Sequence, residues 1–176
     1  MTAPGTLVSG GNPLESIPSA VWQGGGLTLG QVKDLTGLDS PAIQNWIKRG
    51  YVAPPENRKY SKDRVARILT INALRETMKL ETVAKLISYV NGSLVDSSDD
   101  LIPDSQLYDM FCRAVEVFDG DLYVDQAVLR QSIAQGCSCL GDTQAAERIA
   151  RTLMLMCTCY RSIMIKRTVD DIIEAL

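Results

Sequence analysis

The sequence predicts an all-α protein, mainly helical, with one short β-element. Apolar residues recur at three- and four-residue spacing in several segments, which is the period of a helix face. Ser, Thr or Asp stands before many of these segments and Gly after several, as at helix ends. One stretch, between Gly50 and Ser61, has instead the adjacent prolines and short extended pieces of a hairpin.

Charge is unevenly distributed along the 176 residues. Residues 27–80 carry ten basic and five acidic side chains, whereas residues 81–176 carry eight basic and fifteen acidic ones. A basic segment in a chain of net charge −3 favours an anionic partner for that segment. The alternative is solvated charge on an ordinary surface.

Composition predicts four segments. They are a flexible N-terminal arm rich in Gly and Pro at 1–26, a first domain at 27–92, an acidic linker at 93–103 and a helical oligomerisation or sensing domain at 104–176. The sequence has no secretory signal and no apolar run near the roughly 20 residues of a membrane span. We therefore expect a cytoplasmic protein that contacts no membrane, with reduced cysteines.

Two short helices joined by a tight turn follow the arm. Thr28 opens a capping box, and Gly37 ends the first helix. Ser40 is expected to cap the second helix, with Pro41 at its first position and Gly50 beyond its end. This arrangement is typical of a helix-turn-helix, in which the second helix enters the major groove of DNA.

The second helix has a polar face opposite the apolar face formed by Ile43, Trp46 and Ile47. Asn and Gln can pair with adenine edges, while Lys and Arg reach guanine or phosphate. We therefore predict that the polar face contacts DNA, an ordinary solvated helix face being the alternative. Its residues are Gln44, Asn45, Lys48 and Arg49.

Basic residues continue through a hairpin into the next helix. Two extended pieces, 51–52 and 58–60, flank a turn in which two prolines restrict the ribbon to an edge. Ser61 is expected to cap the following helix, and another helix covers residues 80–90. We predict that this wing and helix face phosphate through Arg58, Lys59, Lys62, Arg64 and Arg67.

The stretch LTLGQVKDLTGLDSPAIQNWIKRGYVAPPENRKYSKDRVARI, followed by LETVAKLI, resembles the winged helix-turn-helix of MerR-type transcription regulators over about residues 27–90. In that family a proline-bearing wing and an Arg-x-Tyr-Ser motif follow the recognition helix, and Arg58, Tyr60 and Ser61 occupy those places here. IQNWIKRG, KYSKDRVARI and SQLYDMFC are most similar to a small MerR-like bacterial group known as domain of unknown function 1836. The resemblance implies a sequence-specific regulator that binds double-stranded DNA, with Tyr60 among its contacts.

The acidic half is expected to contain three helices: one from Asp104 or Ser105 to before Gly120, one over 121–134, and a long one from Asp142-Thr143. The stretch LMLMCTCY, residues 153–160, is apolar on nearly all sides of the long helix. Because three helices give little cover, we expect a homodimer through residues 104–176. An internal core is the alternative.

We predict neither a metal site nor an active site. Cys137 and Cys139, like Cys157 and Cys159, are two residues apart, closer than the usual ligands of structural zinc. We interpret them as buried reduced thiols. The chain lacks His, a G-x-S-x-G motif, a P-loop and a G-x-G-x-x-G motif, so we expect no enzyme and no cofactor.

Two other functions are compatible with these features. One is a protein-interaction adaptor that keeps the winged-helix fold without binding DNA. The other is an architectural DNA binder, which bends DNA with weak sequence preference. The sequence identifies no small-molecule effector.

Overall fold

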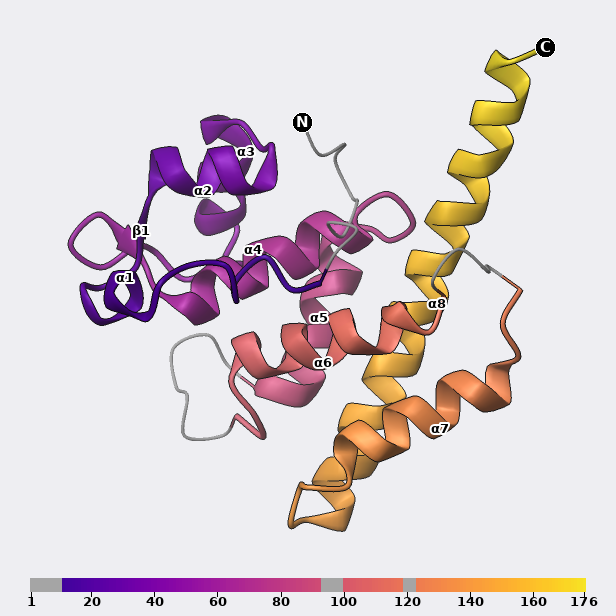
Figure 1. The fold of residues 1–176 in the computed structure, drawn as a ribbon. Helices are drawn as coiled ribbons and strands as arrows, with labels where there is room; N and C mark the ends of the chain where they lie inside the picture. Colours follow the sequence, from indigo (N-terminus) through magenta and orange to yellow (C-terminus); the bar gives the residue numbers. More distant parts are fainter. Residues whose placement is uncertain (1–10, 93–99, 119–122) are drawn as a thin grey trace.

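The computed structural model describes residues 11–92, 100–118 and 123–176, which form eight helices and a two-stranded sheet (Figure 1). The all-α class with a small β-element is therefore confirmed. Within these ranges, no helix has both the length and the apolar character needed to cross a membrane. The helices are α1 Ser19–Gln23, α2 Leu29–Thr36, α3 Ser40–Lys48, α4 Lys62–Leu74, α5 Leu80–Asn91, α6 Asp104–Glu116, α7 Gln126–Cys137 and α8 Thr143–Glu174, and the strands are β1 Leu27–Thr28 and β2 Lys59–Tyr60.

The predicted pair of short helices is present, with one change in how the second begins. The Thr28 N–H donates to Gln31 Oε1 at 2.9 Å, completing the capping box of α2. The N-cap of α3 is Asp39 rather than Ser40, since Asp39 Oδ1 accepts from the Ala42 N–H at 2.8 Å. A carboxylate is a stronger acceptor than a hydroxyl for these N–H groups, so α3 starts one residue earlier than predicted.

The wing differs from the prediction in its strand partner. β2 pairs antiparallel with β1, with Leu27 opposite Tyr60, and not with residues 51–52. Gly26 makes this close approach possible: its φ is 105°, and a Cβ built there would lie 1.9 Å from the carbonyl oxygen of Tyr60. The start of α2 and the wing are therefore joined by one small sheet.

One hydrophobic core runs through the described residues. It joins Ile43 of α3, Ile71 of α4 and Phe111 of α6. Helix α4 is buried over ten successive residues, 65–74, and lies between the α2–α3 pair and α6 (Figure 1). The two predicted domains thus share one core, while residues 93–99 of the predicted linker fall outside the described residues.

The described part of the N-terminal segment is packed on this core. Leu14 is 1% exposed, and Ile17 and Trp22 are partly buried against the core. Asn12 Nδ2 donates to Asp109 Oδ1 of α6 at 3.2 Å. Residues 11–26 therefore belong to the folded body rather than to the flexible arm that composition suggested, because their few apolar side chains find cover on other elements. Residues 1–10 are not among the described ones.

Helices α6 and α8 of the acidic half begin at their predicted positions, whereas α7 begins at Gln126, five residues after the predicted start at 121. Helix α8 has Asp142 as its N-cap, as expected, and α7 is capped by Asp125. Helix α6 begins at Asp104 without a side-chain cap. Neither Asp104 nor Ser105 is the N-cap, because the Asp104 carboxylate turns toward α4 and α5 instead.

The apolar centre of α8 is covered by the same chain. Leu153 is 1% exposed and Met156 is fully buried, and the rings of Phe111 and Tyr160 form an edge-to-face pair with centroids 6.0 Å apart. Helices α4, α5, α6 and α7 all contact α8. The internal-core alternative therefore holds for the buried positions of this stretch, which include Leu153, Met156, Cys157 and Tyr160, whereas Leu155 is 54% exposed. The homodimer stays a prediction.

A buried polar cluster ties α4 and α5 to the start of α6. Arg67, 4% exposed, donates from Nη1 to Asp104 Oδ2 at 3.0 Å, and Asn91 Nδ2 donates to Asp104 Oδ1 at 2.7 Å. Burial raises the pKa of the Asp104 carboxyl, while the Arg67 charge and the Asn91 hydrogen bond lower it in part. The cluster fixes where α6 docks on α4.

Replacing one residue of the Arg67–Asp104 ion pair should lower the free energy of unfolding more than replacing both. Arg67→Met leaves a buried carboxylate without its cation and should lower the free energy of unfolding by about 3–5 kcal/mol. Arg67→Met combined with Asp104→Leu should recover part of that loss, since two apolar side chains need no partner. Urea unfolding measures both. Arg64→Met, which breaks an ion pair to the exposed Glu56, is the control and should cost at most about 1 kcal/mol.

Gly26→Ala should destabilise the protein by about 2 kcal/mol or more, because the new methyl group collides with the Tyr60 backbone and the φ is unfavourable. Gly30→Ala is the matched control. Gly30 lies in α2, where a Cβ would meet only Thr28 Oγ1 at 4.0 Å, an ordinary van der Waals contact, so this change should stabilise by about 0.5–1 kcal/mol. Thermal unfolding of the two variants should therefore shift in opposite directions; a common direction would contradict the role given to Gly26.

Candidate nucleic-acid interface

Helix α3 is held on the body by its apolar face. Ile43 is fully buried and Trp46 is 2% exposed. The guanidinium carbon of Arg75, just beyond α4, lies 6.0 Å from the centre of a Trp46 ring. These contacts fix the rotation of α3 about its axis. Its opposite face therefore presents side chains in fixed directions, and all four predicted contact residues on it are exposed: Gln44, Asn45, Lys48 and Arg49.

Arg49 is already engaged by acidic and aromatic neighbours. Its Nη2 pairs with the Glu81 carboxylate at the start of α5, and its guanidinium carbon lies 5.0 Å from the centre of the Tyr51 ring. Glu81's own backbone N–H and the Tyr51 hydroxyl, followed by Arg49, lower the pKa of the Glu81 carboxyl. A phosphate bound at Arg49 would have to compete with this carboxylate.

The tip of the wing is a tight turn with unusual backbone angles. The Lys59 N–H donates to the Glu56 carbonyl at 2.8 Å, and the Glu56 N–H donates back to the Lys59 carbonyl at 3.0 Å. Between them, Asn57 has a φ of 48° and Arg58 a φ of 62°, as in a type I′ hairpin turn. Gly is preferred at the second of these positions. Arg58 thus places an exposed cation at the tip while its backbone carries strain.

Two other basic residues of the wing region contact their neighbours. Lys59 Nζ donates to the Gly24 carbonyl at 2.5 Å. Arg64 Nη2 donates to Glu56 Oε1 at 2.5 Å, and this contact lowers the pKa of the Glu56 carboxyl. Lys62, at the first position of α4, is exposed. Of the wing and α4 residues, Arg58 and Lys62 are therefore the most accessible cations.

Tyr60 and Arg67 are removed from the predicted set of DNA contacts. Tyr60 is 3% exposed and belongs to the core, where burial raises its pKa. Arg67 is held in the buried ion pair with Asp104. The spacing of apolar residues in α4 predicts that Arg67 is exposed. Helix α6, however, covers that side of α4, and this long-range contact cannot be predicted from the local sequence. The other predicted residues lie on α3, the wing and the start of α4, at the opposite end of the molecule from α7 and α8 (Figure 1).

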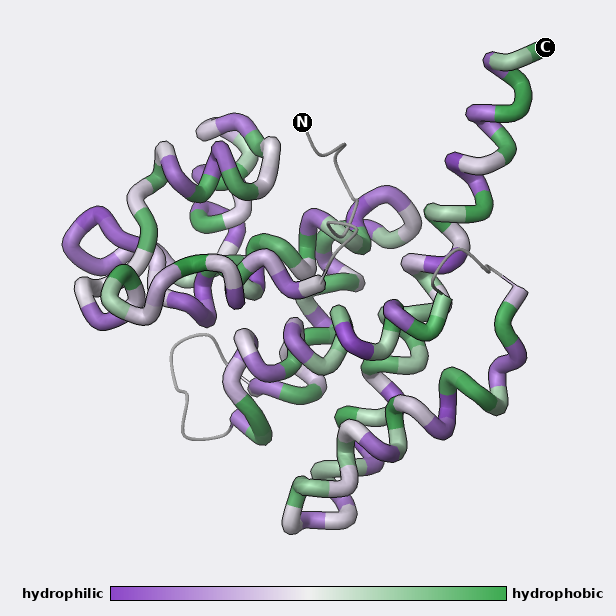
Figure 2. Tube along the Cα trace, in the orientation of Figure 1, coloured by the Kyte–Doolittle hydropathy of each residue, from purple (hydrophilic) through white to green (hydrophobic). Residues whose placement is uncertain are grey.

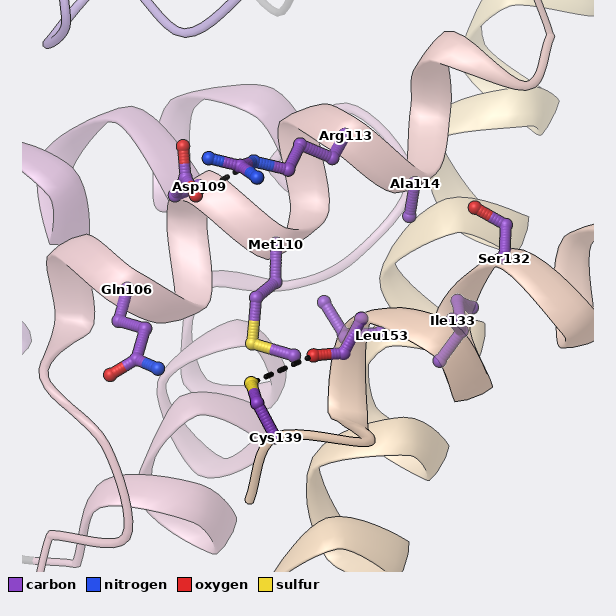
Figure 3. Close-up of a pocket in the computed structure, with 10 residues that line it drawn as sticks. Gln106, Asp109, Met110, Arg113, Ala114, Ser132, Ile133, Cys139 and Leu153 are labelled. Carbon is purple, nitrogen blue, oxygen red and sulfur yellow. Dashed lines mark hydrogen bonds and ion pairs between the residues drawn. The ribbon is translucent and has the colours of Figure 1, made fainter.

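A second candidate site is a cavity of about 250 Å³ between α6 and α7 (Figure 3). Arg113 and Asp109 line it and pair with each other, Nε to Oδ2, at 3.0 Å. Arg113 also lies 3.8 Å from a Glu15 oxygen. Its charges are thus satisfied within the protein, and the remaining lining is mostly apolar, including Met110 and Leu153. We assign no ligand to it.

The cysteines show no arrangement suited to a metal. Among the described residues, no group of three or more His, Cys, Asp or Glu side chains could hold a metal ion. All five thiols are free. Burial raises the pKa of Cys112 and of Cys157 to about 12, which keeps both protonated at neutral pH. Cys139 is exposed, contrary to the expectation of buried thiols, and Cys159 Sγ lies 3.3 Å from Met78 Sδ.

Comparisons with known proteins find matches to parts of the chain. Residues 26–111 match the model of a family described as "Domain of unknown function (DUF1836)". Over 111 residues the chain is 32% identical to "Uncharacterized protein YkrK" of Bacillus subtilis (strain 168). That alignment covers 61% of this chain and 46% of the relative, so the chain spans less than half the length of the curated protein it matches. No solved structure matches the chain.

The family match crosses the predicted domain boundary. It runs from the residue before β1 into α6 and so includes Arg67, Asn91 and Asp104. The matched unit therefore contains the buried cluster that docks α6 on α4. The extent of the family match therefore agrees better with one shared core than with a first domain that ends at residue 92.

Replacing Arg58 with Gly should relieve the strain at the tip of the wing. Gly adopts positive φ without steric cost, so Arg58→Gly should raise the free energy of unfolding by about 0.5–1 kcal/mol. Arg58→Ala has the same loss of charge but keeps a Cβ and should not stabilise. Urea unfolding compares the two variants. Equal stabilities would show that the positive φ of Arg58 carries little strain.

Proposed function

We propose that the protein is a sequence-specific DNA-binding transcriptional regulator of MerR-like type. The observation that carries the proposal is the polar face of α3. It follows a tight turn, is fixed by the buried Ile43 and Trp46, and presents Gln44, Asn45 and Lys48 to solvent. An exposed helix with amide and basic side chains on a rigid base is suited to reading base edges in the major groove.

The proposed contacts divide into two kinds. Gln44 and Asn45 carry both donor and acceptor atoms and are assigned to base edges, where an amide can bond adenine in pairs. Arg58 and Lys62 are assigned to phosphate, since cations on a wing and at a helix start bind the backbone without reading sequence. Because few cations are fully available, affinity should depend on a small number of phosphate contacts.

Acidic neighbours limit the basic surface and favour one alternative. Glu81 pairs with Arg49, and Glu56 pairs with Arg64, so each of these cations is partly neutralised. A surface whose cations are already paired would suit a protein-interaction adaptor that keeps the fold without binding DNA. The two functions differ in whether the purified protein retains genomic DNA fragments at moderate salt.

Variants at the two kinds of contact should have different effects on binding. Arg58→Ala and Lys62→Ala should each weaken all duplexes alike and lower the slope of log affinity against log salt by about one unit. Asn45→Ala should reduce the gap between the retained sequence and random duplex by about 1–3 kcal/mol, with the slope nearly unchanged. Arg151→Ala, an exposed cation on α8, is the matched control and should change neither quantity.

Fluorescence anisotropy at several salt concentrations gives both readouts. Wild-type protein that binds no DNA at low salt would reject the regulator and leave the adaptor. DNA binding that survives Arg58→Ala and Lys62→Ala without a change in salt slope would reject the assignment of the wing to phosphate. Bending of any sequence with little preference among duplexes would favour an architectural binder instead.

A further inference from the structure

Two arginines of the proposed DNA-binding surface stand beside carboxylates. Figure 2 shows hydrophilic residues at the tip of the wing and on α3. Within this region Arg49 is paired with Glu81, and Arg64 is paired with Glu56. The two pairs differ in exposure, since the Arg49 side chain is 43% exposed and the Arg64 side chain only 19%. Arg49 is therefore the paired cation that an incoming phosphate reaches more easily.

Arg49 is held in place by two neighbours. It is the C-cap of α3 and so stands at the end of the helix proposed to read bases. Its Nη2 contacts Glu81 Oε1, and its guanidinium carbon lies 5.0 Å from the centre of the Tyr51 ring, a cation–π contact. A phosphate that approaches Arg49 meets the negative charge of Glu81 as well as the positive charge of Arg49. The net attraction is small as long as Glu81 keeps its charge.

The Glu81 carboxylate has other partners besides Arg49. Its own backbone N–H, followed by the Tyr51 hydroxyl, hydrogen-bonds the carboxylate and lowers its pKa. The Glu81 side chain is also 50% exposed, so water can replace the guanidinium. Exchange of Arg49 from carboxylate to phosphate therefore leaves no buried, unpartnered charge, and it costs no more than the loss of an exposed ion pair.

We propose that Glu81 competes with DNA phosphate for Arg49 and thereby limits the affinity of the protein for every duplex, without taking part in the reading of sequence. The inference rests on the proposed function, because it takes α3 as the DNA-binding helix. It adds a residue of α5, outside the helix-turn-helix and the wing, that weakens binding. Loss of the Glu81 charge should therefore strengthen binding, whereas loss of Arg58 or Lys62 should weaken it.

Glu81→Gln removes the charge and keeps the shape of the side chain. Fluorescence anisotropy of the full chain should show about three- to tenfold tighter binding, equally for the retained sequence and for random duplex, because phosphate contacts do not read bases. Glu147→Gln is the matched control. Glu147 is an exposed acid on α8, and the same charge change there should alter affinity less than about twofold at physiological salt, where charges are screened over roughly 8 Å.

A double-mutant cycle identifies Arg49 as the residue through which Glu81 acts. Arg49→Ala should weaken binding less than about threefold in the wild-type background, where Glu81 already cancels the charge of Arg49. In the Glu81→Gln background the same change should weaken binding about tenfold. A merely structural effect of Glu81→Gln would leave the two losses equal. Circular dichroism checks that all variants are folded.

The outcomes separate this proposal from the regulator itself. Equal losses in the two backgrounds, or no gain in affinity for Glu81→Gln, would overturn the competition and leave the regulator intact. Binding that appears only in the Glu81→Gln protein would support the competition and reject the regulator. If neither protein binds any duplex at low salt, both proposals fail.

Discussion

The burial of α4 on all sides is the constraint on which the rest of this structure depends. Ten successive residues of that helix are at most 8% exposed, so several other elements must supply its cover. The α2–α3 pair covers one side, and α5, α6 and α8 cover others. This buried stretch of α4 contains Arg67, whose charge needs a carboxylate partner. Asp104, at the start of the covering helix α6, is that partner. Packing and charge pairing thus select the same docking position.

Local chemistry made much of the fold predictable. The capping box at Thr28, the Gly that ends α2 and the N-caps at Ser61 and Asp142 are short-range features, and each lies where the sequence indicates. The helix-turn-helix and the exposed face of α3 follow from them. The N-cap of α3 was misplaced by one residue because both Asp39 and Ser40 are good caps, and only the backbone geometry decides between them.

Long-range contacts made the remainder unpredictable. Strand β1 has only two residues, and its second residue, Thr28, is also the N-cap of α2. It is too short to show the alternating pattern of a strand, so its pairing with β2 could not be predicted. The position of Arg67 in the helical pattern of α4 predicts a surface residue, and it is buried because α6 packs over it. The sequence predicts a subunit interface at the apolar centre of α8, because the cover that α4 and α5 give to α8 cannot be deduced from the sequence. In the candidate site, the polar face of α3 was predictable, while the pairings of Arg49 with Glu81 and of Arg64 with Glu56 were not.

The single core has a consequence for how the protein can be divided. A fragment cut at residue 92 would keep the complete helix-turn-helix and wing, yet it would uncover one side of α4 and leave the Arg67 guanidinium in a newly exposed apolar surface without its carboxylate. The smallest autonomous unit must therefore include α6, which is also where the family match ends. Helices α2 and α3, the wing and the helical region are in this sense one cooperative unit, so a change at the α4–α6 contact would be transmitted to the whole fold rather than to a separate module.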